Sequence, residues 1–146
     1  MSQNKLGDIM TRNIVTVSPQ QTISEAAQIM SQYNIGSVPV VQNGQCVGII
    51  TDRDITLRVT AKGQDAGMTK VESVMSKNVV TGNPQMSVQE AANLMAQNQI
   101  RRLPVVDNNN QICGIVALGD LAVQNVYQDE AGEALSSISE PASPQM

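Results

Sequence analysis

Two stretches of the chain decide its fold: IGSVPVVQNGQCVGIITDRDI at residues 35–55 and IRRLPVVDNNNQICGIVALGDL at residues 100–121. Each reads as an apolar β-branched run, a polar turn, a second apolar run and the start of a helix. Asn43-Gly44 is a strong hairpin signal in the first stretch, and residues 107–110 form a longer polar turn in the second. The two stretches align in order with one inserted residue, which predicts two copies of one unit.

The similarity continues upstream, where residues 6–41 align with residues 71–106 without a gap. Matched identities include Met10 with Met75, Thr16 with Thr81, Pro19 with Pro84, Glu25–Ala27 with Glu90–Ala92, Met30 with Met95, and Ile35 with Ile100. Chance does not align this many identities in order over so short a segment, so the repeat defines the organisation of the chain.

Each copy is expected to be a β-α-β-β-α unit, which makes the fold class α+β. The first copy predicts a strand at Ile14–Val17, a helix at Glu25–Tyr33 capped by Ser24, strands at Ser37–Val41 and Cys46–Thr51, and a helix from Asp52 to Thr60. One such unit cannot cover both faces of its sheet, so we expect the copies to pack with pseudo-twofold symmetry around related clefts. The expected domains are repeat 1 at 6–60, repeat 2 at 70–126 and a polar tail at 127–146.

Composition narrows the class of protein. The chain has 146 residues, of which 41% are apolar and 15% charged, a globular balance. Its net charge of −4 argues against nonspecific binding to nucleic acid. We see no membrane-spanning run and no signal-peptide pattern, so we expect a cytoplasmic protein without membrane attachment.

Catalytic and metal-binding patterns are missing from the sequence. There is no histidine, and Cys46 and Cys113 lack zinc-ligand spacing, so they are expected to be buried thiols rather than a disulfide. The chain shows no nucleophile elbow, Walker A motif or GxGxxG run. We therefore expect no enzyme, no metal site and no required cofactor.

The two copies resemble the CBS domain, named for cystathionine β-synthase, and the pair is similar to a Bateman module. The motifs that carry the resemblance are MTRNIVTVSP from Met10, IGSVPVV from Ile35 and GIITDRDI from Gly48, with IRRLPVVD from Ile100 and GIVALGDL from Gly114 in the second copy. The resemblance covers roughly residues 6–124. It implies a regulatory module that binds AMP, ADP, ATP or a related adenosyl compound between the repeats and signals to a protein effector in trans or to its own assembly.

The resemblance also implies which residues meet the ligand. In the GhxTxxD motif of the family, the Asp accepts from the ribose hydroxyls and the Thr donates to phosphate. Thr51 and Asp54 complete this motif in the first copy, whereas the second has Asp120 but Ala117 in place of the Thr. The resemblance places the base and phosphate pocket at Thr16, Gly36, Ser37 and Val38 in one copy, and at Thr81, Arg101, Arg102 and Leu103 in the other.

Structural interpretations stand beside these functional ones. Asp54 and Asp120 begin helices, where Asp is a favoured cap, and Arg101 with Arg102 can be a solvated pair on opposite sides of a strand. An interaction module that binds no nucleotide is the alternative function, and Ala117 favours it. A homodimer is expected because helical faces carry few large polar groups, at Ala26, Ala27 and Met30 and at Ala91, Ala92 and Met95.

Overall fold

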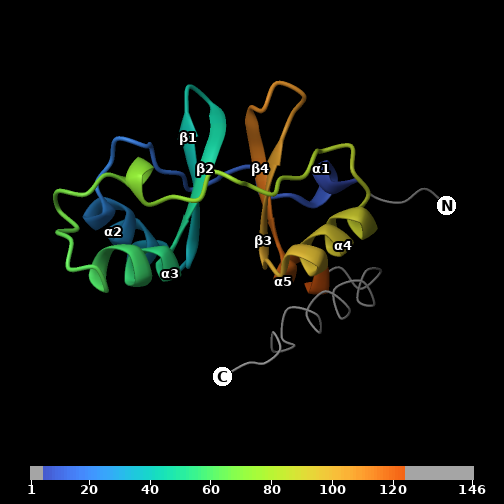
Figure 1. Cartoon of the computed structure of the whole chain (residues 1–146). Helices are drawn as coiled ribbons and strands as arrows, with labels where there is room; N and C mark the ends of the chain where they lie inside the picture. Colours follow the sequence, from blue (N-terminus) through green and yellow to red (C-terminus); the bar gives the residue numbers. More distant parts are fainter. Residues whose placement is uncertain (1–4, 124–146) are drawn as a thin grey trace. The chain divides into compact units, whose positions relative to one another are not determined.

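The computed structural model describes residues 5–123 of the chain. Its helices are α1 Leu6–Ile9, α2 Ile23–Tyr33, α3 Asp52–Ile55, the π-helix η1 Thr56–Thr60, the 3-10 helix η2 Val71–Ser73, α4 Val88–Asn98 and α5 Leu118–Val123. Its strands are β1 Ser37–Gln42, β2 Gln45–Thr51, β3 Arg102–Val106 and β4 Ile112–Ala117 (Figure 1). The mixture of helices with two small sheets, β1–β2 and β3–β4, confirms the predicted α+β class. The predicted tail at 127–146 lies outside the described residues.

The described chain divides into two compact units. The N unit contains residues 15–79 and 109–112, and the C unit contains residues 5–14, 80–108 and 113–123. Each unit has its own core of buried aliphatic side chains, led by α2 with β1 and β2 in the N unit and by α4 with β3 and β4 in the C unit. Figure 1 shows the corresponding helices beside each hairpin.

The N unit begins its main helix with a capping box. Thr22, not the predicted Ser24, is the N-cap of α2: its hydroxyl accepts from the backbone N–H of Glu25 at 3.2 Å, and the Glu25 carboxylate accepts from the backbone N–H of Thr22 at 3.0 Å. This reciprocal pair satisfies two amides that the first helical turn leaves without partners. Ser87 and Glu90 form the same box on α4.

The predicted strand at Ile14–Val17 is reduced to one bridge. Val17 alone pairs with β1: it donates to Pro39 O at 3.1 Å and accepts from the N–H of Val41 at 2.8 Å. A parallel ladder extended back by two residues would need the N–H of residue 39, which proline lacks. In the C unit, Gly82 pairs with β3 in the same way and Pro104 occupies the matching position.

A short leader at the start of each sequence repeat packs on the body of the other repeat. In the C unit, Leu6 N–H donates to Met86 O at 2.8 Å, and Thr11 pairs with Ile115 of β4. In the N unit, residues 70–76 make the matching contacts, and Ser76 pairs with Ile49 of β2. The compact units are therefore offset from the sequence repeats by about one leader length.

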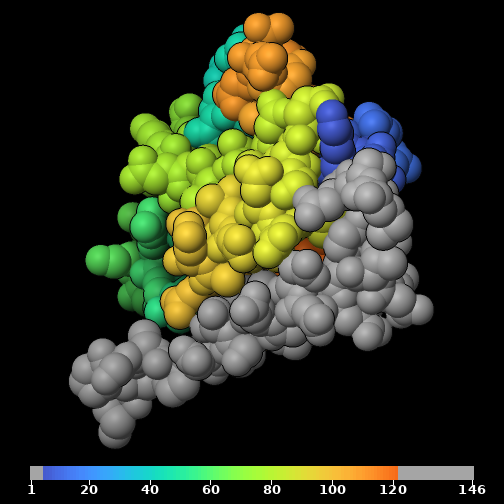
Figure 2. Space-filling model, turned by 90° about the vertical axis from the view of Figure 1, so that its right-hand side faces the viewer, coloured from blue at the N-terminus to red at the C-terminus, as the bar shows by residue number. Residues whose placement is uncertain are grey.

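The apolar helical faces invoked for a dimer are core surfaces. Ala26, Ala91 and Met95 are fully buried within their own units, Met30 and Ala92 are nearly so, and Ala27 is half-buried. The residues that α4 exposes are polar, namely Gln89, Glu90, Asn93, Gln97 and Asn98, in the yellow region of Figure 2. The reasoning behind the dimer prediction was therefore wrong, and the dimer itself stays a prediction. No helix in residues 5–123 has both the length and the apolarity to cross a bilayer.

Candidate functional site

Each unit builds one candidate site where its first strand begins and its second strand passes into a helix. In the N unit, Ser37 pairs with Thr51 across the hairpin, and Asp52 N–H donates to Gly36 O at 2.9 Å. In the C unit, Leu118 N–H donates to Arg101 O at 2.7 Å. The two units thus close the strand–helix junction with the same backbone hydrogen bond.

Thr51 and Asp54 form a capping box at this junction in the N unit. Asp54 N–H donates to Thr51 Oγ1 at 3.0 Å, and Thr51 N–H donates to Asp54 Oδ2 at 3.0 Å. The cap interpretation of Asp54 is therefore correct. It does not exclude the ribose role, because an ionised carboxylate has about four acceptor sites and a threonine hydroxyl that accepts can still donate.

Arg58 connects Asp54 to a more distant part of the N unit. Its Nε lies 3.8 Å from Asp54 Oδ1, and its Nη1 donates to Val74 O at 3.0 Å. The Asp54 side chain is only 17% exposed, so this carboxylate is shielded but reachable. Arg58 belongs to the π-helix that follows α3, and Val74 belongs to the leader of the second repeat. The Asp54–Arg58 spacing of four residues was the sequence signal for this pair.

The C unit forms only half of the box. Asp120 Oδ2 accepts from Ala117 N–H at 3.0 Å, as Asp54 does from Thr51. Ala117 has no side-chain oxygen to return the bond to Asp120 N–H. The asymmetry predicted from the sequence is thus present in the hydrogen bonding of the two helix starts.

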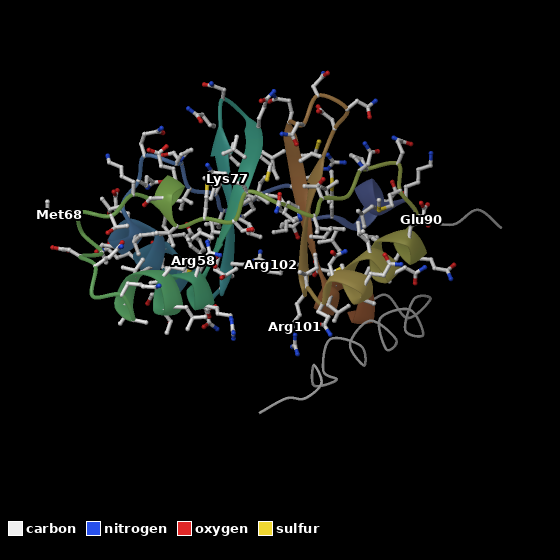
Figure 3. All side chains as sticks on the ribbon, viewed as in Figure 1. Arg58, Met68, Lys77, Glu90, Arg101 and Arg102 are labelled. Carbon is white, nitrogen blue, oxygen red and sulfur yellow. The ribbon has the colours of Figure 1, made fainter. Side chains whose placement is uncertain are left out.

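Arg101 directly precedes β3 and Arg102 is its first residue, and the two side chains point in different directions (Figure 3). Arg101 is exposed, whereas Arg102 is half-buried. Burial lowers the pKa of the Arg102 guanidinium from its ordinary value, and the nearby charge of Asp120 partly offsets that effect. Arg102 is thus the arginine of the pair that shares its surroundings with the candidate ribose-binding carboxylate.

The remaining predicted site residues divide between accessible and buried positions. Thr16 and Thr81 are half-buried and precede the bridging residue of each unit. Val38 and Leu103 are fully buried in the two cores, so the structure exposes neither residue to a ligand. Residues 5–123 contain no group of three His, Cys, Asp or Glu side chains placed to hold a metal ion.

Sequence reasoning missed the role of Asp52. A Cβ built on Gly36 would lie 3.1 Å from Asp52 Oδ2, so the Asp52 carboxylate lies directly over Gly36. The aligned positions in the C unit are Leu118 and Arg101. Comparison of the two copies at these two positions was the available signal, because the pair carries an acid in the first copy, with Asp52 in place of Leu118, and a base in the second, with Arg101 in place of Gly36.

Comparisons with known proteins agree with this geometry. The model of the CBS domain family matches residues 6–60 and again residues 71–124. The CBS domain-containing protein YhcV of Bacillus subtilis (strain 168) is 58% identical over 132 residues, which cover 90% of this chain and 93% of that protein. An inosine-5′-monophosphate dehydrogenase of Methanocaldococcus jannaschii is 37% identical over 128 residues, which cover 87% of this chain but only 25% of the enzyme.

A solved structure shares the fold of the pair. The CBS domain pair of protein MJ0100, crystallised with 5′-methylthioadenosine and S-adenosyl-L-methionine, superposes with a TM-score of 0.72 at 29% identity. The match covers 88% of this chain and 99% of that one.

Proposed function

Since this chain belongs to the CBS domain family and carries the domain twice, as a regulatory pair, we propose that it binds an adenine nucleotide or another adenosyl compound. The pair of MJ0100 was crystallised with two adenosyl ligands, which supports this ligand class. We further propose that occupancy is passed to a protein effector or to a homodimer, and that the chain works in the cytoplasm.

The observation that carries the proposal is the repeated Asp at the strand–helix junction. Asp54 and Asp120 each use one carboxylate oxygen to accept a backbone N–H at 3.0 Å. The second oxygen of each carboxylate can accept from the two neighbouring hydroxyls of a ribose, and a charged acceptor makes such bonds strong. Both positions are half-buried, where water competes less for these hydrogen bonds.

Within this proposal, the other family positions take supporting roles. The Thr51 hydroxyl donates to the 5′ side of the ligand in the N unit, and Arg101 and Arg102 supply positive charge for a phosphate in the C unit. Thr16, Thr81, Gly36 and Ser37 line the ligand, whereas the buried Val38 and Leu103 support the starts of β1 and β3 from the two cores. The location between the repeats stays a prediction.

Calorimetric titration of the full chain with AMP, ADP, ATP, NAD, 5′-methylthioadenosine and S-adenosyl-L-methionine tests the proposal. Replacement of Asp54 or Asp120 by Ala should weaken its own site about tenfold or more, because a hydrogen bond to a charged group contributes about 1.5–3 kcal/mol. The same two replacements also remove a helix cap, so a loss of stability alone would not identify a ligand role.

Matched controls separate the two effects. Glu25→Ala and Glu90→Ala break the equivalent capping boxes of α2 and α4. Glu90 lies at the opposite end of α4 from Arg101 (Figure 3). We expect all four variants to lose stability and only the two Asp variants to lose affinity. If no adenosyl compound binds the unmodified chain at millimolar concentration, the interaction module that binds no nucleotide is the better description.

A further inference from the structure

The two candidate sites share one backbone hydrogen bond, but its charged partner is acidic in the N unit and basic in the C unit. Asp52 N–H donates to Gly36 O in the N unit, and Leu118 N–H donates to Arg101 O in the C unit. Across this hydrogen bond, the N unit places a carboxylate over a glycine. The C unit places an arginine opposite a leucine. The local geometry is therefore conserved between the units while its charge is inverted.

The C unit collects positive charge around its carboxylate. Arg101 O accepts from the N–H of Leu118 at the start of α5, Arg102 is the next residue, and Asp120 is the single acidic residue of that helix. Two cations against one anion leave an excess of one positive charge. Arg102 is half-buried, and a partly desolvated guanidinium interacts strongly with an anion that shares its surroundings.

The N unit has no such excess. The two negative charges of Asp52 and Asp54 balance the two positive charges of Arg53 and Arg58. Arg58 already contacts Asp54 Oδ1 and donates to Val74 O. Arg53 is exposed, and its backbone N–H donates to Asp52 Oδ1 at 2.8 Å. The carboxylate nearest to the strand start is that of Asp52, which would repel a phosphate placed there.

We propose that the two units select different charge classes of adenosyl ligand. The C unit takes a ligand whose ribose carries a phosphate, and Arg102 is its specificity-determining residue. The N unit takes an adenosyl ligand whose 5′ substituent is uncharged or cationic, and Asp52 excludes the phosphate. This inference rests on the proposed function, because it assumes that Asp54 and Asp120 each hold a ribose.

AMP and 5′-methylthioadenosine are the probes, because they share adenine and ribose and differ in the charge of the 5′ substituent. Calorimetry is done on the full chain with one site removed at a time. Asp54→Ala leaves the C-unit site and should bind AMP about tenfold more tightly than 5′-methylthioadenosine, as expected for one charged hydrogen bond. Asp120→Ala leaves the N-unit site and should bind 5′-methylthioadenosine more tightly than AMP.

Two further substitutions test the named residues. In the Asp54→Ala background, Arg102→Gln should lower the affinity for AMP about tenfold and change the affinity for 5′-methylthioadenosine by less than about twofold. In the Asp120→Ala background, Asp52→Asn should raise the affinity for AMP and leave the affinity for 5′-methylthioadenosine unchanged. The preference of the C unit for AMP should shrink as the salt concentration rises from about 0.05 to 0.5 M, since salt screens the charge of the exposed Arg101.

The outcomes separate this inference from the function on which it rests. If both single-site variants bind the two probes with the same preference, the charge selection is wrong and the proposed function stands. If the unmodified chain binds neither probe nor any other adenosyl compound, both fall. Should Asp54→Ala or Asp120→Ala fail to fold, the Asn variants keep an oxygen for the helix cap and remove the charge, so they replace the Ala variants in the comparison.

Discussion

The incomplete capping box of the C unit can be repaired by one substitution, Ala117→Thr. Asp120 already accepts from the residue 117 N–H at 3.0 Å, as Asp54 accepts from Thr51 N–H at 3.0 Å. The missing half is a hydroxyl that accepts from Asp120 N–H, a bond that Thr51 provides at 3.0 Å in the N unit. Loss of an N-cap oxygen costs about 1 kcal/mol, so its addition should raise the free energy of unfolding by about that amount.

Equilibrium denaturation in guanidinium chloride measures this gain as a higher midpoint with an unchanged slope. In a chain of this size, about 1 kcal/mol corresponds to a rise in Tm of about 2–4 °C. Slower amide hydrogen exchange at Asp120 gives a local measure if the units unfold separately. The reverse substitution, Thr51→Ala, should lower stability by a similar amount. An unchanged or lowered midpoint for Ala117→Thr, with no slowing at the Asp120 amide, would refute the capping role assigned to Asp120.

Three further predictions follow from other contacts. Gly114→Ala should lower the free energy of unfolding by about 1–3 kcal/mol, because the added Cβ would lie 2.7 Å from Thr11 O, whereas Gly119→Ala meets nothing within 4 Å and should not destabilise; equal denaturation midpoints would contradict this. Hydrogen bonds from the N-cap residue Thr22 lower the pKa of Glu25 in the folded chain. The Glu25 carboxylate therefore stabilises the fold above its unfolded-state pKa, and this stabilisation is lost as the pH falls through its folded-state pKa. Glu25→Gln should therefore flatten the stability profile between about pH 5 and 3, and an unaltered acid limb would count against it. Burial raises the pKa of Cys46, so iodoacetamide at about pH 8 should label it far more slowly in the folded than in the unfolded chain, by mass spectrometry; equal rates would show that the thiol is accessible.

Most of the fold could be predicted from the internal repeat in the sequence. Its aligned turn, strand and helix signals predict both hairpins and both long helices, and the structure has them within a few residues. The prediction of a first strand in each repeat was wrong, because Pro39 and Pro104 lack the N–H that would extend the ladder. This reason becomes visible only when the pairing of the strands is known. The cap of α2 shifted to Thr22 because a capping box with Glu25 satisfies two amides and Ser24 cannot.

The candidate site was predicted in its residue types more fully than in its contacts. The spacing from Thr51 to Asp54 is the same for a capping box and for the family motif, so the sequence could not separate the two roles. The position of Asp52 over Gly36 requires the backbone hydrogen bond between them, which joins residues of different elements. Burial of the helical alanines could not be read from one repeat alone, because packing against the hairpin decides which face is covered.

The central claim is that adenosyl ligands bind at the strand–helix junctions, and a titration of the ¹⁵N-labelled chain with AMP tests it most directly, by NMR, at the junction of the C unit. The account predicts saturable chemical-shift changes at the amides of Ala117, Asp120 and Arg102. The amide signals of Glu25 and Glu90, in the first turns of α2 and α4, should not shift. Uniformly small changes without saturation at millimolar AMP, or changes centred on Glu25 and Glu90, would contradict the account.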